Sequence, residues 1–282
     1  MTGVAQAEQL LDGVLRVVAP NPSPMTGPGT NSYIVGHSRC AIIDPGVDDA
    51  AHLDALAAAA PGEVVAILVT HAHPDHTGGA RRLAERLNAP VYAFPLELQG
   101  IRDEGFAPQR PLYHGDIVDL DTICLEAIHT PGHTADHLCF FWREAGLLFA
   151  GDTVMADVTV VILPPDGDMS AYMQSLEQLQ ALPIERIAPG HGRLLEDAPA
   201  VLAQIVTHRR ERETQVWESL SADEPMTAEQ IAIQLYPDLD VRLQPMAAAQ
   251  VKAHLIRLVE LGDALAVTDG WLCVQDADPL FY

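Results

Sequence analysis

Four side chains that can bind a metal ion lie within six residues, directly after an apolar segment of the chain. Residues 64–70 have the length and composition of a buried strand, and the motif His71-Ala72-His73-Pro74-Asp75-His76 follows them. Imidazole and carboxylate groups are poor core fillers, because burying them without a partner is costly. Both groups suit zinc, and they suit manganese and iron less selectively. The motif therefore favours a metal-binding loop at a strand end over a polar loop whose histidines only cap the strand.

Three later motifs also place such side chains after apolar segments or in tight turns. They are His133 in residues 130–134, Asp152 after residues 147–150, and His191 in residues 189–192, which follow the apolar residues 184–188. An earlier carboxylate, Asp44, ends the apolar residues 40–44. Between these motifs apolar strands alternate with helical segments, such as residues 52–60 and 79–87. This alternation predicts a layered α/β domain.

These five motifs resemble those of the metallo-β-lactamase superfamily, in the same order and at similar spacing. The resemblance implies an α/β fold of the αββα sandwich type. It also implies two divalent metal ions per chain, zinc first, with manganese or iron as alternatives. One ion would be bound by His71, His73 and His133, the other by Asp75, His76 and His191, and Asp152 would bridge both. Asp44 would support the ligand loop from behind.

The same resemblance implies a hydrolase in which a hydroxide held between the two ions attacks a carbonyl or phosphorus centre. Asp75 and Asp152 would be its catalytic residues, because Asp75 orients the nucleophile and Asp152 holds both ions. Class B1 β-lactamases carry a cysteine where Asp152 stands, and di-iron flavoproteins carry a glutamate where His73 stands. We therefore expect neither a dedicated β-lactamase nor an oxygen- or nitric-oxide-reducing enzyme.

The segment after residue 199 predicts a second, smaller module. A long amphipathic helix over residues 200–220 ends before Pro225, and Thr227 has the chemistry of an N-cap for the next helix. A further helix over residues 245–261 is followed by two short strands with an Asp-Gly hairpin signal between them. This order is that of a winged helix. We expect a catalytic domain over residues 1–199, then a helical linker with a small winged-helix-like domain over residues 200–282.

Further segments resemble one branch of the superfamily, the lactamase-beta-like protein 2 group. They are residues 21–24, residues 30–33, residues 164–169 with Tyr172, and His208-Arg209-Arg210-Glu211-Arg212-Glu213. This group includes a single-strand endoribonuclease. The resemblance therefore implies either a phosphodiesterase that acts on RNA or a hydrolase that acts on a small ester, thioester or lactone. A winged-helix regulator with a vestigial hydrolase domain is a third interpretation, which the complete set of predicted ligands disfavours.

The charge of the chain favours the small-molecule substrate. The formal net charge is −23, and Lys252 is the only lysine. Residues 200–282 hold six basic and thirteen acidic side chains, whereas binding of nucleic acid depends on contacts from lysine and arginine to phosphates. The basic cluster Arg209-Arg210-Glu211-Arg212-Glu213 is interrupted by acids. We expect the winged helix to pack over the active site or to form a homodimer contact rather than to bind nucleic acid.

Two smaller groups of residues have a weaker motif context. His137, four residues after His133, either supports the metal pocket or caps the strand that follows it. The Pro- and Gly-rich residues 20–29 are long for a hairpin connection and predict a functional loop. Asn31, Ser32 and Tyr33 follow this loop, and they either line the pocket or serve the fold alone.

Cysteine usage and hydropathy bear on the compartment. The four cysteines show no paired spacing; they are Cys40, Cys124, Cys139 and Cys273. The first twenty residues lack the pattern of a signal peptide, and no stretch of eighteen apolar residues occurs. We expect a cytoplasmic protein with reduced thiols and no membrane span.

Overall fold

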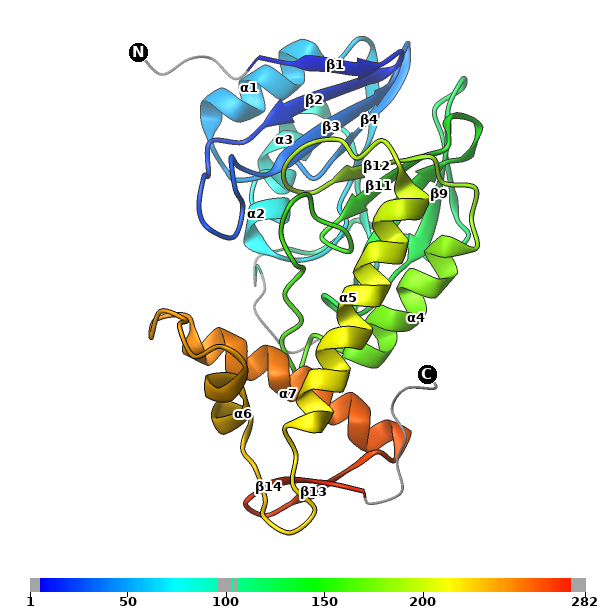
Figure 1. Cartoon of the computed structure of the whole chain (residues 1–282). Helices are drawn as coiled ribbons and strands as arrows, with labels where there is room; N and C mark the ends of the chain where they lie inside the picture. The colour runs from blue at the N-terminus through cyan, green and yellow to red at the C-terminus, as the bar shows by residue number, and fades with distance from the viewer. Residues whose placement is uncertain (1–5, 96–102, 104–105, 275–282) are drawn as a thin grey trace.

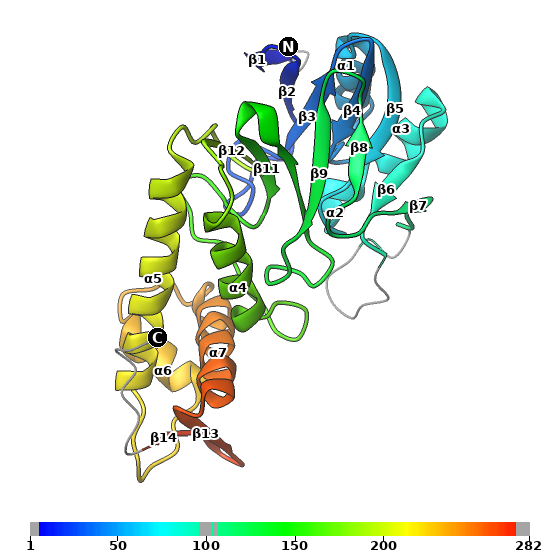
Figure 2. The ribbon, with the colours of Figure 1, turned by 90° about the vertical axis from the view of Figure 1, so that its right-hand side faces the viewer.

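A computed structural model of the chain describes residues 6–95, 103 and 106–274. In the larger part of the molecule two β-sheets pack face to face, and helices cover the outer face of each sheet (Figures 1 and 2). The first sheet has the strand order β1-β2-β3-β4-β5-β6-β7. Its strands are β1 Glu8–Leu11, β2 Val14–Val18, β3 Asn31–Gly36, β4 Arg39–Ile43, β5 Glu63–Leu68, β6 Val91–Ala93 and β7 Arg110–Pro111. Pairing is antiparallel from β1 to β4 and parallel from β4 to β7.

The second sheet has the strand order β12-β11-β10-β9-β8. Its strands are β8 Ile117–Asp119, β9 Cys124–His129, β10 Leu138–Trp142, β11 Leu147–Gly151 and β12 Arg186–Pro189. The predicted pairing of residues 138–142 with residues 147–150 is confirmed, because β10 and β11 form an antiparallel hairpin across the 3-10 turn Arg143–Ala145. β11 then pairs with β12 in parallel.

Three apolar clusters hold the layers together. The inner faces of the two sheets meet in a cluster that includes Ile43, Leu68 and Phe140. On the outer face of the first sheet, α1 (Ala50–Ala59) and α3 (Ala80–Leu87) pack against alternate residues of β4 and β5, such as Ile42. On the second sheet, α4 (Met169–Gln180) and α5 (Ala198–Glu218) pack against residues such as Phe141. The predicted αββα sandwich is confirmed.

The C-terminal module has the predicted winged-helix order. It contains α6 Ala228–Leu235, α7 Gln244–Leu261, β13 Ala264–Val267 and β14 Gly270–Cys273. Thr227 and Gln230 form a capping box at the start of α6, and Gly262 ends α7 in the left-handed conformation at φ 85°. Trp271 and Met226 are joined by backbone hydrogen bonds, which tie the wing to the segment before α6. In the described part of the chain, none of the helices combines the length and the apolar character that a membrane span needs.

The helix α5 belongs to both parts of the molecule. Leu202 near its start packs on the second sheet, whereas Val216 near its end packs in the core of the winged helix. Helices α4 and α7 also contact one another, so the module lies against the sandwich (Figure 2). The domain boundary between residues 199 and 200 falls at the start of α5 and remains a prediction.

Candidate metal centre

The seven predicted donors come from the ends of strands in both sheets, and the structure brings all of them together. His71, His73, Asp75 and His76 lie after β5, in and before the short helix α2 Pro74–Thr77. His133 follows β9, Asp152 follows β11 and His191 follows β12. Because the two sheets face each other, the loops at this edge of the first sheet meet those of the second.

The first group of donors is His71, His73, His133 and Asp152. His73 Nδ1 lies 2.9 Å from His71 Nε2 and 3.1 Å from His133 Nε2. Asp152 Oδ2 lies 3.7 Å from His133 Nε2. Three ring nitrogens and one carboxylate oxygen therefore converge on one point.

The second group is Asp75, His76 and His191, and it faces the other oxygen of Asp152. Asp75 Oδ2 lies 3.6 Å from His76 Nε2 and 3.3 Å from His191 Nε2. Asp152 Oδ1 lies 3.4 Å from each of the same two nitrogens. Asp152 thus presents one oxygen to each group, as a bridging ligand would.

Three of the histidines are held by their other ring nitrogen. Nδ1 of His76 lies 2.8 Å from the Asp44 carboxylate, Nδ1 of His133 lies 2.7 Å from the Val161 carbonyl, and Nδ1 of His191 lies 3.3 Å from the Gly29 carbonyl. A hydrogen-bond acceptor at Nδ1 favours the tautomer whose Nε2 carries a lone pair. That lone pair then faces the other atoms that can bind the metal ion.

Asp44 organises the loop of the first sheet. It follows β4 with φ 47°, a left-handed conformation that aspartate tolerates better than most residues. Its carboxylate accepts hydrogen bonds from the backbone N–H and the hydroxyl of Thr70, both at 2.8 Å, in addition to the contact with His76. Asp44 is buried, so the start of the ligand loop is fixed away from solvent.

The backbone approaches the donors most closely at Gly190. A Cβ at this position would lie 2.4 Å from Asp152 Oδ1 and 2.9 Å from His76 Cε1. Only glycine leaves room for the carboxylate between the two groups of donors. The Pro-Gly-His motif therefore positions His191, and its glycine leaves room for the Asp152 carboxylate.

The pKa values divide the site into two halves. Burial and neighbouring histidines lower the pKa of His71 well below its ordinary value and that of His73 to about 4. Burial also lowers the pKa of His76 and His191, but the surrounding carboxylates, Asp152 first among them, together more than offset this effect. The pKa of His191 rises to about 9, and that of His76 rises well above its ordinary value. His71 and His73 therefore present neutral imidazoles, whereas the second half attracts positive charge.

The donor set fits two divalent cations. Asp152 Oδ1 and His76 Nε2 are buried and make no hydrogen bond within the described residues, although they lie 3.4 Å apart. A tetrahedral site with bonds of about 2.0 Å places its ligand atoms about 3.3 Å apart, which is close to the separations found here. The histidine and aspartate groups can therefore hold two metal ions.

Five of the seven donors line a cavity of about 460 Å³; they are His73, Asp75, His133, Asp152 and His191. Met25 of the loop before β3, Met155, Val161 and Leu163 of the segment between β11 and α4, and Ala249 of α7 supply much of the remaining lining. The predicted functional loop over residues 20–29 thus reaches the site, and so does the winged helix. Among the described residues, no lysine or arginine lines this cavity.

Asn31 and Tyr33 do not line the cavity but hold the His191 loop. Asn31 Nδ2 donates to the carbonyls of Pro189 and Gly192, both at 2.9 Å, and the Tyr33 hydroxyl donates to the Pro189 carbonyl at 2.7 Å. Both side chains are buried. The interpretation that they line the pocket is therefore wrong. Their role depends on partners far along the chain, which no local motif reveals.

His137 supports Asp152 from behind. Its Nε2 accepts a hydrogen bond of 3.0 Å from the backbone N–H of Asp152, and its ring stacks on that of His71 at 5.1 Å. Its Nδ1 lies 3.0 Å from the hydroxyl of Thr130 and 3.1 Å from that of Thr153. Of the two interpretations of His137, support of the metal pocket is the correct one.

The basic cluster of α5 does not form one charged face. Arg209 is 3% exposed; it donates to the Val160 carbonyl and lies 5.1 Å from the centre of the Tyr172 ring. Arg210 is exposed and lies 3.7 Å from Glu177. Arg209 is therefore not part of a charged surface, because the packing of α5 against Tyr172 of α4 buries it.

Comparisons with known proteins agree with this geometry. Residues 25–191 match the model of the metallo-beta-lactamase superfamily, and residues 227–271 match that of the beta-lactamase associated winged helix domain. The chain is 32% identical to the beta-lactamase-like protein 2 homolog of Drosophila melanogaster, over 93% of each protein. It is 33% identical to the atrochrysone carboxyl ACP thioesterase of Passalora fulva, over 76% of this chain and 64% of that protein.

Solved structures give the same fold. The metallo-beta-lactamase family protein TTHA1429 from Thermus thermophilus superposes with a TM-score of 0.77 at 24% identity, over 94% of this chain and 100% of that one. TTHA1623 in a di-iron-bound form superposes with a TM-score of 0.53 at 31% identity, over 63% of this chain and 93% of that one. The motifs, the fold and these matches lead to one conclusion: the chain belongs to the metallo-beta-lactamase superfamily and is a metal-dependent hydrolase with a C-terminal winged helix.

Proposed function

We propose that this hydrolase acts on a small ester, thioester or lactone. The observation that carries the proposal is the cavity, whose walls are largely apolar and, among the described residues, hold no lysine or arginine. A neutral acyl group can pack against such walls, whereas each phosphate of a nucleic acid would lack a cationic partner there. The similarity to a fungal ACP thioesterase supports an acyl substrate.

The residues of the site would divide the work as follows. His71, His73 and His133 would hold one cation, Asp75, His76 and His191 would hold the other, and Asp152 would face both. When bound, two divalent cations supply a water that deprotonates near neutral pH and positive charge for the developing oxyanion. Burial raises the pKa of Asp75, but His76 and His191 lower it to about 2. The Asp75 carboxylate therefore stays ionised and can accept a hydrogen bond from the attacking water, which orients it.

The test is a panel of matched substrates: a neutral acyl thioester, its oxygen ester, a lactone, bis(p-nitrophenyl) phosphate and single-stranded RNA. We expect kcat/KM for an acyl substrate to exceed that for the phosphodiester by at least about 100-fold, or about 2.7 kcal/mol in transition-state stabilisation. The Asp152→Ala protein, purified in the same way, gives the background. Cleavage of RNA or of the phosphodiester in preference to every acyl substrate would reject the proposal in favour of a phosphodiesterase.

We expect about two metal ions per chain, with zinc preferred on the basis of the nitrogen and oxygen donors. The di-iron form of TTHA1623 makes iron the alternative to measure beside manganese. Elemental analysis of protein purified without chelator gives both the identity and the count. His76→Ala should lose about one ion, since it removes a donor of one group only, whereas His114→Ala changes an exposed histidine and should lose none. Wild-type protein without a stoichiometric transition metal would contradict the assignment.

We expect single-stranded RNA to bind with a dissociation constant above about 1 μM at physiological salt. The reason is that few lysine and arginine side chains are available to neutralise phosphates. Trp217, Tyr236 and Trp271 are half-buried against the core of the winged helix, which limits base stacking. The measurement is a titration of Asp152→Ala protein at two salt concentrations. Sub-micromolar binding with a salt slope that Arg210→Ala and Arg212→Ala remove would overturn this expectation.

A further inference from the structure

A second cavity, of about 310 Å³, lies where α5, α7 and the segment after α6 meet. We call it the α5–α7 cavity. Arg209 and Arg212 of α5, Leu243 before α7, and Met246, Gln250 and His254 of α7 line it. It adjoins the metal-site cavity, since Val161 lines both, but it contains none of the metal donors. It is therefore a site distinct from the metal centre.

The polar lining of the α5–α7 cavity is basic. The chain has 39 acidic and 16 basic side chains, yet two arginines and two histidines line this cavity and no aspartate or glutamate does. Among the described residues, neither arginine has an ion-pair partner: Arg209 donates to the Val160 carbonyl, and Arg212 lies 4.7 Å from the centre of the Tyr236 ring. Glu213 lies close by, but one of its carboxylate oxygens is 3.1 Å from Arg257 Nη1 and the other is 3.5 Å from His254 Nδ1.

Polar atoms in this lining lack partners. Arg209 Nε, Gln250 Oε1 and His254 Nε2 are all buried without a hydrogen bond within the described residues. Arg209 is 3% exposed and His254 is 1% exposed. A buried cation without a counter-ion is strongly unfavourable, and unsatisfied buried polar atoms add to that cost. An anionic ligand in the cavity would supply the missing counter-ion and an acceptor for the Nε–H group of Arg209.

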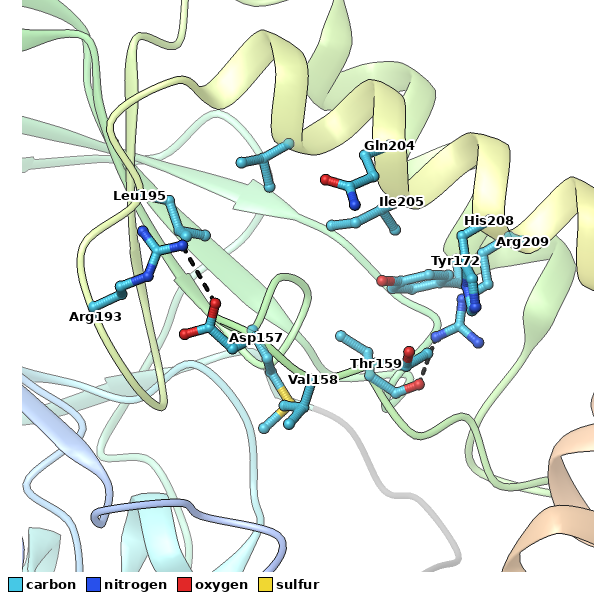
Figure 3. A pocket seen from close by; sticks show the side chains of 13 residues that line it. Asp157, Val158, Thr159, Tyr172, Arg193, Leu195, Gln204, Ile205, His208 and Arg209 are labelled. Atoms are coloured by element: carbon cyan, nitrogen blue, oxygen red, sulfur yellow. Dashed lines mark hydrogen bonds and ion pairs between the residues drawn. The ribbon is translucent and has the colours of Figure 1, made fainter. Parts of the chain in front are cut away.

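The neighbouring cavity on α5 provides a contrast within the same molecule. Figure 3 shows that Arg209 and His208 line it too, with Arg209 beside the ring of Tyr172. There the additional arginine, Arg193, is exposed and lies 3.3 Å from the carboxylate of Asp157. Arg209 and Arg212 both line the α5–α7 cavity, whereas Arg212 does not line this neighbouring one.

Apart from Thr159 and Tyr236, the remaining lining of the α5–α7 cavity is apolar. Leu239, Met246 and Val251 contribute to it, and Leu243 is 47% exposed at its edge. A guanidinium group matches a carboxylate through two parallel hydrogen bonds, and apolar walls favour a hydrocarbon body. We propose that the α5–α7 cavity binds a small organic carboxylate with an apolar body, which pairs with Arg209 and Arg212 and packs against Leu243 and Met246.

The test is calorimetric titration of the metal-loaded protein with octanoate and with its neutral analogue octanamide. We expect octanoate to bind at least about tenfold more tightly than octanamide, acetate or inorganic phosphate. Arg212→Gln removes one cation, and Leu243→Glu adds a repelling charge at an exposed position. Each should weaken octanoate binding by at least about tenfold. Arg210→Gln, on the same helix but paired with Glu177 outside the cavity, should bind octanoate within about twofold of wild type.

The design separates this site from the metal centre, to which a carboxylate can also bind. Neither Arg212 nor Leu243 lines the metal-site cavity, so octanoate held there would be insensitive to both variants. Octanoate binding that is unchanged in both variants overturns the proposal. So does the absence of binding, or equal affinity for octanamide, acetate or phosphate. Thermal melts check that each variant is folded, and the outcome does not depend on which substrate the enzyme hydrolyses.

Discussion

Replacement of Asp152 by alanine is expected to lower kcat/KM by at least about 100-fold, a loss of about 2.7 kcal/mol in transition-state stabilisation. Asp152 Oδ1 faces His76 and His191, and Oδ2 faces His133, so the substitution removes a donor from both groups at once. Loss of a bridging carboxylate disturbs both metal positions and the water between them. The measurement is steady-state hydrolysis of the best acyl substrate, with metal content determined on the same sample.

The fold should survive this substitution, because the Asp152 side chain borders the cavity rather than filling the core. Circular dichroism and a thermal melt check this point. Asp157→Ala is a matched control, since that carboxylate lies on the same segment and its side chain is 68% exposed. If Asp152→Ala keeps near-normal turnover with metal bound, the two-metal mechanism is wrong for this protein.

Asp44→Asn is expected to weaken the binding of one metal ion, and to lower kcat/KM, by about 10–100-fold. The two oxygens of Asp44 accept from the Thr70 backbone, the Thr70 hydroxyl and His76 Nδ1. An amide has only one acceptor oxygen. If its NH₂ group faces His76, the imidazole takes the tautomer protonated at Nε2, which cannot bind a metal ion. If the NH₂ group faces the Thr70 N–H, two donors oppose each other.

Asparagine tests this argument cleanly because it keeps the shape of aspartate and tolerates the same left-handed backbone. Asp48→Asn, an exposed carboxylate four residues further on, serves as the control. Metal titration should show that one ion binds weakly and the other with its original affinity. Unchanged affinity for both ions in Asp44→Asn would mean that Asp44 does not set the tautomer of His76.

The convergence of the donors could be predicted from the sequence because their motifs resemble those of the metallo-β-lactamase superfamily and stand after apolar segments. His71, Asp152 and His191 each follow an apolar segment, and such segments become neighbouring strands whose ends lie at one edge of the sandwich. The same pattern of apolar segments predicts the helices and the wing of the C-terminal module. It does not reveal the edge strands β7 and β8, because most of their side chains are exposed.

Contacts between distant segments could not be predicted in this way. Tyr33 and Asn31 look like an ordinary strand, and only the fold brings them to Pro189, more than 150 residues away. Arg209 looks like part of a basic surface, since a helical pattern does not say which turn meets Tyr172 of another helix. Such roles depend on packing partners, so they became visible only with the structure.

The metal-site cavity combines two kinds of residue that are free to change independently. The donors are fixed by strand ends and buried hydrogen bonds, and a substitution among them removes a metal ligand that hydrolysis requires. Met25, Leu163 and Ala249 come from two connecting segments and α7. None of these three residues takes part in the hydrogen bonds that orient His76, His133 and His191. Related enzymes can therefore acquire new substrates through changes at such positions while they keep one chemistry. For this reason the motifs identify the reaction far better than they identify the molecule on which it acts.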